Sequence, residues 1–367
     1  MKRHLITLLK IVLSLGIVAY LVYDIKRSGA VEGRDVFSDL IYGSKNWGYL
    51  ALAIGFCFSA VLFTMIRWHF LLRALDIPTK FLSTLRIAFV GYFFNLAPLG
   101  IAGGDLVRVM LINGKHENIK AKSIASVVLD RVIGLYMLFV VASVAIWFAG
   151  FHGTAKDPII LTIHGMTLTM CEMTWLLAIV GGVVAAILMI PSVTEGRLAN
   201  SLGKLPGIGG AMASLLEAIR MYRRRPGVLL LASLLTVGVH SFFAIGVYMI
   251  ARWLPGPDHT ISTHMVIMPL SASAGAIPLS IGPFEAVLEY FYYTIPLAVG
   301  TMMKGQGFVT ALGYRLITVL IALVGAICYF KARREVSQAM HDVEETREES
   351  SLEDGPNIAL SQEQSAA

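Results

Sequence analysis

Seven ionisable side chains lie in or beside long apolar stretches of this sequence, and they are the residues best placed to do chemistry there. Charged groups in apolar surroundings are costly to keep, so they are functional candidates by default. Arginine presents a planar fork of donors that suits phosphate or carboxylate. A carboxylate beside an arginine holds it in place while a site is empty, or exchanges a proton or cation. The seven residues are Asp105, Arg108, Asp130, Arg131, Glu285, Glu289 and Arg315.

Plainer explanations compete with a binding role. Asp105 and Arg108 are three residues apart, and Asp130 and Arg131 are adjacent. Either pair is also typical of an interfacial charge cluster that only sets the depth of a helix. We therefore keep both interpretations open for these four residues.

The same holds for three further polar residues. Glu289 lies one helical turn after Glu285 and is either a second acid or a solvated, pore-facing residue. Asn95 either satisfies backbone groups that a helix break sets free or lines a cavity. His240, in the middle of an apolar stretch, is expected to be a hydrogen-bonded packing residue, and no histidine shows metal-ligand spacing.

The composition places these residues in a membrane protein. Of 367 residues, 56% are hydrophobic and 15% are charged, whereas about a quarter are charged in average soluble domains. Apolar stretches long enough to cross a bilayer recur along the chain, so we expect an all-α polytopic membrane protein. The net charge of +6 does not indicate nucleic acid, because the Lys and Arg residues lie in short loops between apolar stretches.

Six stretches are close to the length that a membrane-spanning helix requires. Basic residues in the loops predict that both termini are cytoplasmic, in the inner or plasma membrane. The connection 26–45 weakens this assignment, because it would lie outside with four basic residues. The expected spans are residues 5–23, 49–66, 132–150, 174–190, 228–250 and 308–330.

Two further apolar segments, 87–104 and 264–300, have both flanks predicted on one side of the membrane. Such a segment must be a re-entrant hairpin or cross twice as short half-helices, and Pro and Gly interrupt both. Elsewhere we expect an external loop at 158–171, a short amphipathic helix at 207–225 and interfacial aromatic residues at Tyr290, Tyr292, Tyr293 and Trp253.

The two broken segments share a written pattern. The first reads Pro-Leu-Gly-Ile-Ala-Gly-Gly-Asp from Pro98 to Asp105, and the second reads Pro-Leu-Ser-Ile-Gly-Pro-Phe-Glu from Pro278 to Glu285. Each ends in a carboxylate seven residues after the proline. The residues expected to form the breaks are Pro98, Gly103, Gly104, Pro278, Gly282 and Pro283.

An arginine follows each carboxylate near the start of the next span, Arg131 in the first case and Arg315 in the second. Each half reads as span, broken hairpin, span, at about 47–150 and 228–330, with opposite directions across the membrane. Inverted repeats with broken helices are the signature of many secondary transporters, whose binding site lies where the broken helices meet. The alternative is a pair of unrelated proline-kinked helices.

No enzyme is expected in this sequence. It shows no nucleophile–base arrangement, no phosphate-binding Gly-Lys-Ser/Thr loop and no dinucleotide fingerprint, so no cofactor is expected either. The three cysteines are far apart and predict neither a disulfide framework nor a metal site.

These motifs resemble the transmembrane region of lysylphosphatidylglycerol synthases, a flippase-like membrane family. The resemblance covers about residues 5–332, a single transmembrane domain, and leaves an acidic tail at 333–367 that we expect to be disordered. Its second hairpin departs from the commoner form, which has a double-Gly turn and often a basic residue before the acid. The segments that carry it are 91–98 (Gly-Tyr-Phe-Phe-Asn-Leu-Ala-Pro), 103–108 (Gly-Gly-Asp-Leu-Val-Arg), 130–134 (Asp-Arg-Val-Ile-Gly) and 277–285 (Ile-Pro-Leu-Ser-Ile-Gly-Pro-Phe-Glu).

The resemblance implies a lipid flippase or lipid-linked precursor transporter, moving an anionic, aminoacylated or polyprenyl-linked lipid. The bifunctional members add a soluble aminoacyl transferase domain, and with only a short tail here we do not expect lysyl transfer. The expected partner is a membrane phospholipid or lipid-linked substrate rather than nucleic acid, and a homo-oligomer stays open. The alternatives are a secondary transporter of a small ion or metabolite, and an accessory membrane subunit of envelope glycan or lipid assembly.

Overall fold

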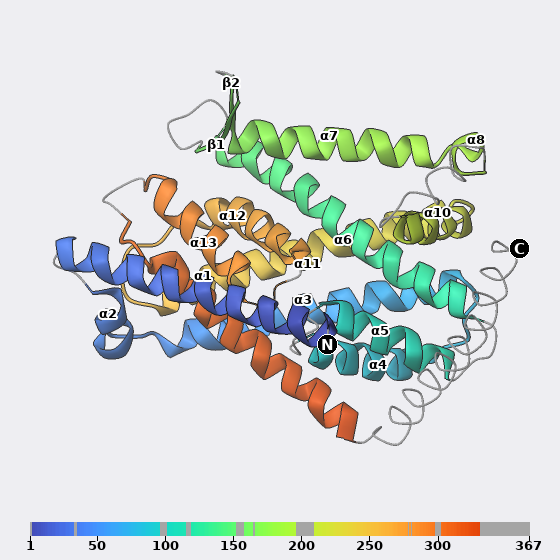
Figure 1. The fold of residues 1–367 in the computed structure, drawn as a ribbon, viewed down its shortest axis with the longest axis horizontal. Helices are drawn as coiled ribbons and strands as arrows, with labels where there is room; N and C mark the ends of the chain where they lie inside the picture. The colour runs from blue at the N-terminus through green and yellow to red at the C-terminus, as the bar shows by residue number, and fades with distance from the viewer. Residues whose placement is uncertain are drawn as a thin grey trace, which may run out of the picture.

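The computed structural model describes residues 2–32, 35–95, 101–114, 119–151, 158–163, 166–195, 209–277, 279, 281–297 and 302–330. Within them the chain is almost entirely helical (Figure 1). Six described helices are long and apolar enough to cross a membrane, and each overlaps one of the six predicted spans. They are α1 (Lys2–Glu32), α3 (Trp47–Ala74), α6 (Lys120–Ala149), α7 (Met170–Leu188), α11 (Pro226–Trp253) and the C-terminal helix Gln306–Phe330.

The centre of the bundle is the contact between α3 and α11, the most extensive between described helices. Small residues let the two backbones approach, as they do in many membrane proteins. A Cβ atom at Gly246 of α11 would lie 2.6 Å from the Cys57 Sγ atom of α3, and one at Gly238 would lie 3.0 Å from the Phe63 ring. Helix α6 crosses this pair and contacts both α3 and α11.

Each of the two segments predicted to be broken folds as a pair of short helices. The first pair is α4 (Phe81–Phe94) and α5 (Ile101–Asn113), and the second is α12 (Ile261–Ser273) and α13 (Pro283–Thr294). The helices of each pair contact each other. A 3-10 turn, η1 (Ala274–Ala276), follows α12.

The breaks differ in detail from the sequence prediction. Pro98 and Pro278 lie outside the described residues. Gly103 and Gly104 lie in the first turn of α5 rather than in the break itself, because α5 begins at Ile101. Gly104 instead allows close packing, since a Cβ atom there would clash with the Gly91 carbonyl oxygen of α4.

The second break follows the prediction more closely. Gly282 has a φ of 111°, a backbone conformation that only glycine adopts readily, and it is the N-cap of α13. Pro283 begins the helix, where its fixed φ fits and its missing N–H costs nothing.

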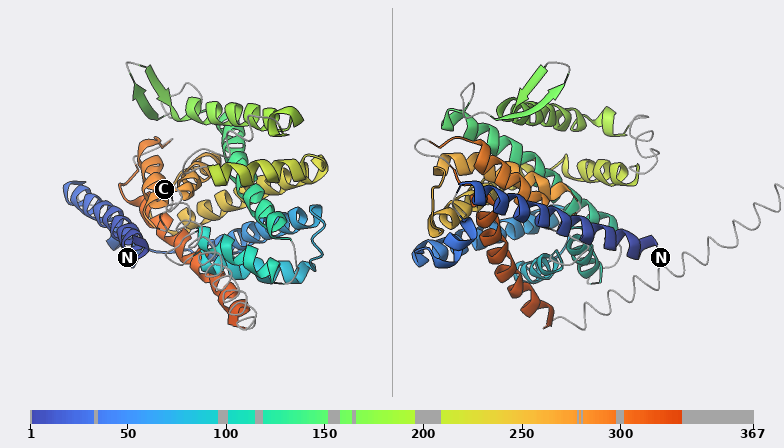
Figure 2. Two further views of the ribbon diagram at one scale, coloured as in Figure 1. Left: turned by 45° about the vertical axis from the view of Figure 1, so that its right-hand side comes forward. Right: turned by 60° about the vertical axis from the view of Figure 1, so that its left-hand side comes forward.

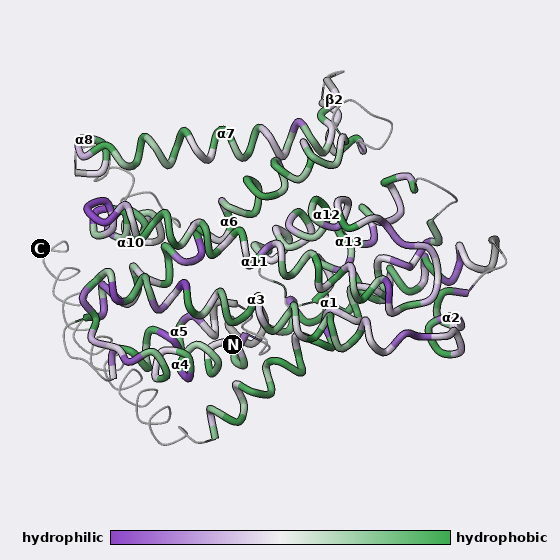
Figure 3. The backbone as a smooth tube through the Cα atoms, turned by 180° about the vertical axis from the view of Figure 1, so that it is seen from behind, coloured by the Kyte–Doolittle hydropathy of each residue, from purple (hydrophilic) through white to green (hydrophobic). Residues whose placement is uncertain are grey.

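Peripheral elements surround the bundle (Figure 2). Helix α1 packs through Leu21 and Ile25 against Phe308 of the C-terminal helix, and α7 packs on α6. The hydropathy of both helices is high along most of their length (Figure 3). Two short helices, α2 (Val36–Tyr42) and α8 (Pro191–Glu195), lie in connections between spans.

Two segments outside the spans refine the sequence prediction. The helix predicted at 207–225 is present as α10 (Gly209–Tyr222), and it packs on α6 with Tyr222 fully buried. The expected loop at 158–171 is wrong, because Ile159–Ile163 and Met166–Thr169 form an antiparallel hairpin, β1 and β2. Their Ile and Thr residues favour strands.

Candidate functional site

The first charged contact joins α5 to α6. Asp105, in the second turn of α5, accepts two hydrogen bonds from the fork of Arg131. Arg131 Nε lies 2.8 Å from Oδ2, and an Arg131 terminal nitrogen lies 2.6 Å from Oδ1. Both carboxylate oxygens are therefore engaged in a bidentate, charge-assisted pair, the strongest common form of this interaction.

The second contact joins α13 to the C-terminal helix in the same way. Glu285 Oε1 accepts hydrogen bonds from Arg315, at 3.0 Å from Nε and 2.7 Å from a terminal nitrogen. Its other oxygen, Oε2, accepts the Gly282 N–H at 2.7 Å and so caps α13. One carboxylate thus fixes both the helix start after the break and the arginine of the next helix.

The two contacts are equivalent in their place along the chain. Arg131 follows Asp105 by 26 residues, and Arg315 follows Glu285 by 30. In both, the helix after a break pairs with the next long helix. The arginine side chains keep 38% and 29% of their surface exposed, whereas the carboxylates are more deeply buried. A ligand can therefore reach the guanidinium groups more easily than the acids.

A third pair lies deeper and was missed by the sequence prediction. Arg67 of α3 donates from Nε to Asp130 Oδ1 of α6 at 2.7 Å, and from a terminal nitrogen to Thr236 of α11 at 2.7 Å. Arg67 had been assigned to a cytoplasmic loop, but α3 continues to Ala74 and places it inside the bundle. His240 of α11 bonds the Gly134 carbonyl oxygen of α6 at 3.1 Å. As predicted, His240 is a hydrogen-bonded packing residue, and these contacts link three long helices.

Arg108 of α5 is the least satisfied of the arginines. It is buried, and its nearest approach to Asp105 is 3.7 Å, because Arg131 already occupies that carboxylate. The guanidinium group lies over the Trp68 ring, 5.3 Å from the ring centre. Its Nε atom has no hydrogen-bond partner among the described residues.

These residues form what we call the first charged cluster. Arg108 is within electrostatic range of both Arg67 and Asp130, so the members act on one another. Three guanidinium groups face two carboxylates, which leaves a formal charge of +1 among the described residues of the cluster. An anion is the ligand that such an excess favours. Its members are Arg67, Asp105, Arg108, Asp130 and Arg131.

The remaining predicted residues support the helices around the charges. Asn95 caps the C-terminus of α4 beside Gly104, and its side-chain oxygen is buried without a hydrogen-bond partner among the described residues. Glu289 accepts the backbone N–H groups of Gly305 and Phe308 at 2.6 and 2.8 Å. Glu289 is buried, so the solvated, pore-facing alternative is wrong.

Helix α4 connects the first charged cluster to the second pair. The Tyr92 side chain is within electrostatic range of both Arg108 and Arg315. The same helix packs tightly on the C-terminal helix, where a Cβ atom at Gly325 would clash with the Phe89 carbonyl oxygen. The two charged contacts are thus neighbours in space although distant in sequence.

A histidine–tyrosine cluster also escaped the sequence prediction. Tyr292 was expected at a membrane interface, but it is fully buried, with its hydroxyl 2.5 Å from His264 Nε2. Its carbonyl oxygen lies 3.0 Å from His259 Nε2. No group of three metal-ligating side chains occurs among the described residues.

Comparison with known proteins agrees with this architecture. Residues 7–325 match the family described as the lysylphosphatidylglycerol synthase TM region. The chain belongs to this family. It is also 29% identical over 122 residues to a UPF0104 membrane protein of Pyrococcus horikoshii, which covers 33% of each chain. The match therefore spans about a third of that relative's length, and no solved structure matches the chain.

Proposed function

We propose that this protein moves an anionic or aminoacylated lipid, or a lipid-linked precursor, across the membrane. The observation that carries the proposal is the matched pair of arginine–carboxylate contacts, Asp105–Arg131 and Glu285–Arg315. The excess positive charge of the first charged cluster favours an anionic headgroup. The family's name refers to an anionic-lipid pathway, and the membrane region is proposed to transport the lipid without performing lysyl transfer.

The contacts suggest how a headgroup would be held. In the empty protein each carboxylate occupies the fork of its arginine. A phosphate offers the same fork an equivalent set of acceptors, so it competes with the carboxylate for the guanidinium group. The arginine exchanges one anion for another and is never left bare, which limits the cost of binding at membrane depth. Arg108 adds a cation with an unused donor.

We further propose that the two short-helix pairs are re-entrant hairpins in an inverted repeat. The order span, paired short helices, span occurs in α3, α4–α5 and α6, and again in α11, α12–α13 and the C-terminal helix. The equivalent ion pairs support this relationship. Rocking of one half against the other would then open the headgroup site alternately to the two membrane faces. Both termini are proposed to be cytoplasmic.

The proposal is tested by reconstituting the full chain into liposomes with headgroup-labelled phosphatidylglycerol and following transbilayer movement. A hydrogen bond to a charged group contributes about 1.5–3 kcal/mol. Arg131→Gln or Arg315→Gln should therefore slow movement at subsaturating lipid by about tenfold or more. Arg225→Gln is the matched control, because Arg225 makes an exposed ion pair with Asp76.

Two outcomes would count against a lipid transporter. One is equal movement in the Arg315→Gln variant and in the natural protein. The other is anion-dependent flux of a small solute with no movement of any labelled lipid, which would favour a secondary transporter of a small ion.

A further inference from the structure

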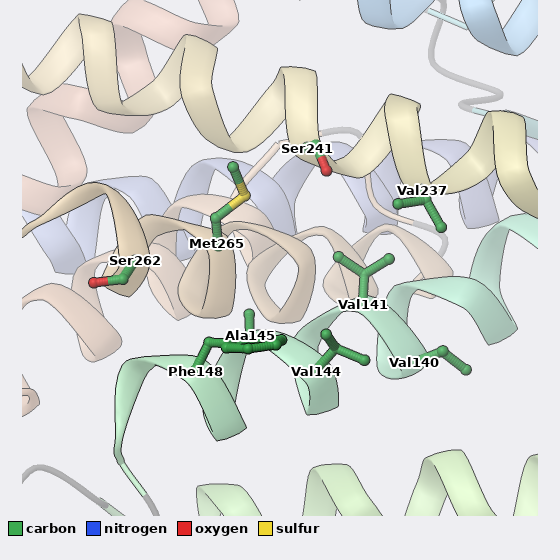
Figure 4. A pocket seen from close by; sticks show the side chains of 9 residues that line it. All are labelled: Val140, Val141, Val144, Ala145, Phe148, Val237, Ser241, Ser262 and Met265. Carbon is green, nitrogen blue, oxygen red and sulfur yellow. The ribbon is translucent and has the colours of Figure 1, made fainter.

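An apolar groove lies between α6, α11 and α12, away from the charged contacts (Figure 4). Its volume is about 400 Å³, within the range of ligand-binding pockets. Seven of its nine lining residues are apolar, and the other two are serines. The lining residues are Val140, Val141, Val144, Ala145 and Phe148 of α6, Val237 and Ser241 of α11, and Ser262 and Met265 of α12.

The groove is open toward the side of the bundle. The Phe148 and Val144 side chains on its rim are exposed, while Val141 on its floor is buried. Figure 4 shows Val141 and Ala145 pointing from α6 toward α11, with Met265 of α12 between the two helices. Helix α7 does not line the groove, because α6 lies between α7 and α11 (Figure 1).

Its two longest walls belong to membrane-spanning helices, α6 and α11. The material outside its open side is therefore lipid hydrocarbon. An unfilled gap would lose the dispersion contacts of its walls, so an apolar groove at this depth favours a flexible apolar occupant. A second helix, about 10 Å across with its side chains, is too wide to enter, whereas a single acyl chain can follow an irregular wall.

One end of the groove leads toward the charged residues. One face of α6 carries, at helical spacing, Asp130, Gly134, Val141, Ala145 and Phe148. Seven residues separate Gly134 from Val141, which is about 10 Å along the helix. On α11, two residues of the buried polar network, Thr236 and His240, directly precede the groove residues Val237 and Ser241. An apolar channel that ends beside a buried cationic network has the polarity of an amphiphile.

We propose that this groove holds one acyl chain of a phospholipid whose headgroup is bound at the first charged cluster. The inference rests on the proposed function and adds the part of the substrate that the charged residues do not recognise. It predicts that the protein selects for a flexible hydrocarbon chain as well as for an anionic headgroup. It also gives α6 two roles, because the same helix carries Arg131 and most of the groove wall.

The test uses phosphatidylglycerol with a photoreactive diazirine in one acyl chain, in liposomes that contain the full chain. After illumination, mass spectrometry of peptides should locate the label on residues 140–148 of α6 and 262–265 of α12. Ala145→Trp fills the groove, so it should abolish this labelling and slow the movement of a two-chain lipid. Ala185→Trp is the matched control, because Ala185 lies on the exposed surface of α7 and should change neither result.

Val144→Trp, at the half-exposed rim, provides the same test if Ala145→Trp does not fold. Labelling that spreads equally over α7 and persists in both tryptophan variants would overturn the groove assignment, as would cross-links between two copies of the chain through Phe148. The same liposomes report movement of headgroup-labelled lipid. Groove labelling without movement would uphold the acyl-chain site and reject transport, whereas movement that is indifferent to groove filling would do the reverse.

Discussion

Replacing Asp130 by Asn should strongly destabilise the protein, because it removes one partner of a buried ion pair. Only 5% of the Arg67 side chain and 2% of the Asp130 side chain are exposed. Asp130→Asn keeps the shape of the side chain but leaves the Arg67 charge uncompensated. Breaking a buried pair in this way costs about 3–5 kcal/mol. The Arg67–Thr236 hydrogen bond remains, but a hydroxyl does not neutralise a guanidinium group.

Removing both charges should cost less than removing one. Replacing a buried ion pair by apolar residues of similar volume is often neutral or stabilising. In the double variant Arg67→Met with Asp130→Leu, Thr236 keeps its hydrogen bond to the Ala232 carbonyl oxygen, so no hydroxyl is left unpaired. The exposed control pair is Arg225–Asp76, with 42% and 70% of the two side chains exposed. Asp76→Asn should therefore change stability by less than about 1 kcal/mol.

The measurement is the free energy of unfolding in mixed detergent micelles for the natural protein, the single variants and the double variant. A loss below about 1 kcal/mol in Asp130→Asn would refute the assignment of a desolvated pair, since that is the range of surface pairs. A double variant as unstable as Asp130→Asn would show that packing, not the unpaired charge, causes the loss.

Two further predictions concern packing and capping, and the same unfolding measurement checks both. Gly325→Ala should destabilise by about 1–3 kcal/mol through overpacking, because its methyl group would meet the Phe89 carbonyl oxygen, whereas Gly55→Ala in open space on α3 should be neutral or stabilising; equal effects would contradict the close contact of α4 with the C-terminal helix. Glu289→Leu should cost about 1–3 kcal/mol by leaving the buried Phe308 N–H unsatisfied, and an unchanged unfolding free energy would contradict its capping role.

The spans were predictable because apolar length alone identifies them. The prediction stopped where a helix continues past its apolar part. Helix α3 runs eight residues beyond the predicted end at Ile66, so Arg67 was assigned to a loop although it is buried against Asp130. Charge at the end of an apolar stretch indicates a membrane boundary on average, but it does not reveal whether a partner waits on another helix.

The candidate site was predictable in part because it repeats. The matched carboxylates and arginines were visible as a pattern, and Asp105 and Glu285 do lie against Arg131 and Arg315. Their role in binding stays a prediction. Glu289 could not be placed from sequence, because its partners are backbone N–H groups at the start of a later helix. Tyr292 was misplaced because interfacial and buried tyrosines have the same local sequence context, and only its contact with His264 distinguishes them.

The two halves share their outer ion pair but differ in what surrounds it. In the first half the residue before the arginine is Asp130, which pairs with Arg67, and Arg108 adds a further cation. In the second half the equivalent residue is Tyr314.

Tyr314 packs against aromatic rings instead of an arginine, with ring centres 5.8 Å from Phe243 and 5.1 Å from Phe284. The positive excess therefore belongs to the first half, whereas the described charges of the second pair balance. Under the proposed function an anion would be held more strongly by the first half than by the second. A transport cycle needs such a difference less than it needs reversible exchange, and the partly exposed Arg131 and Arg315 provide that exchange in both halves.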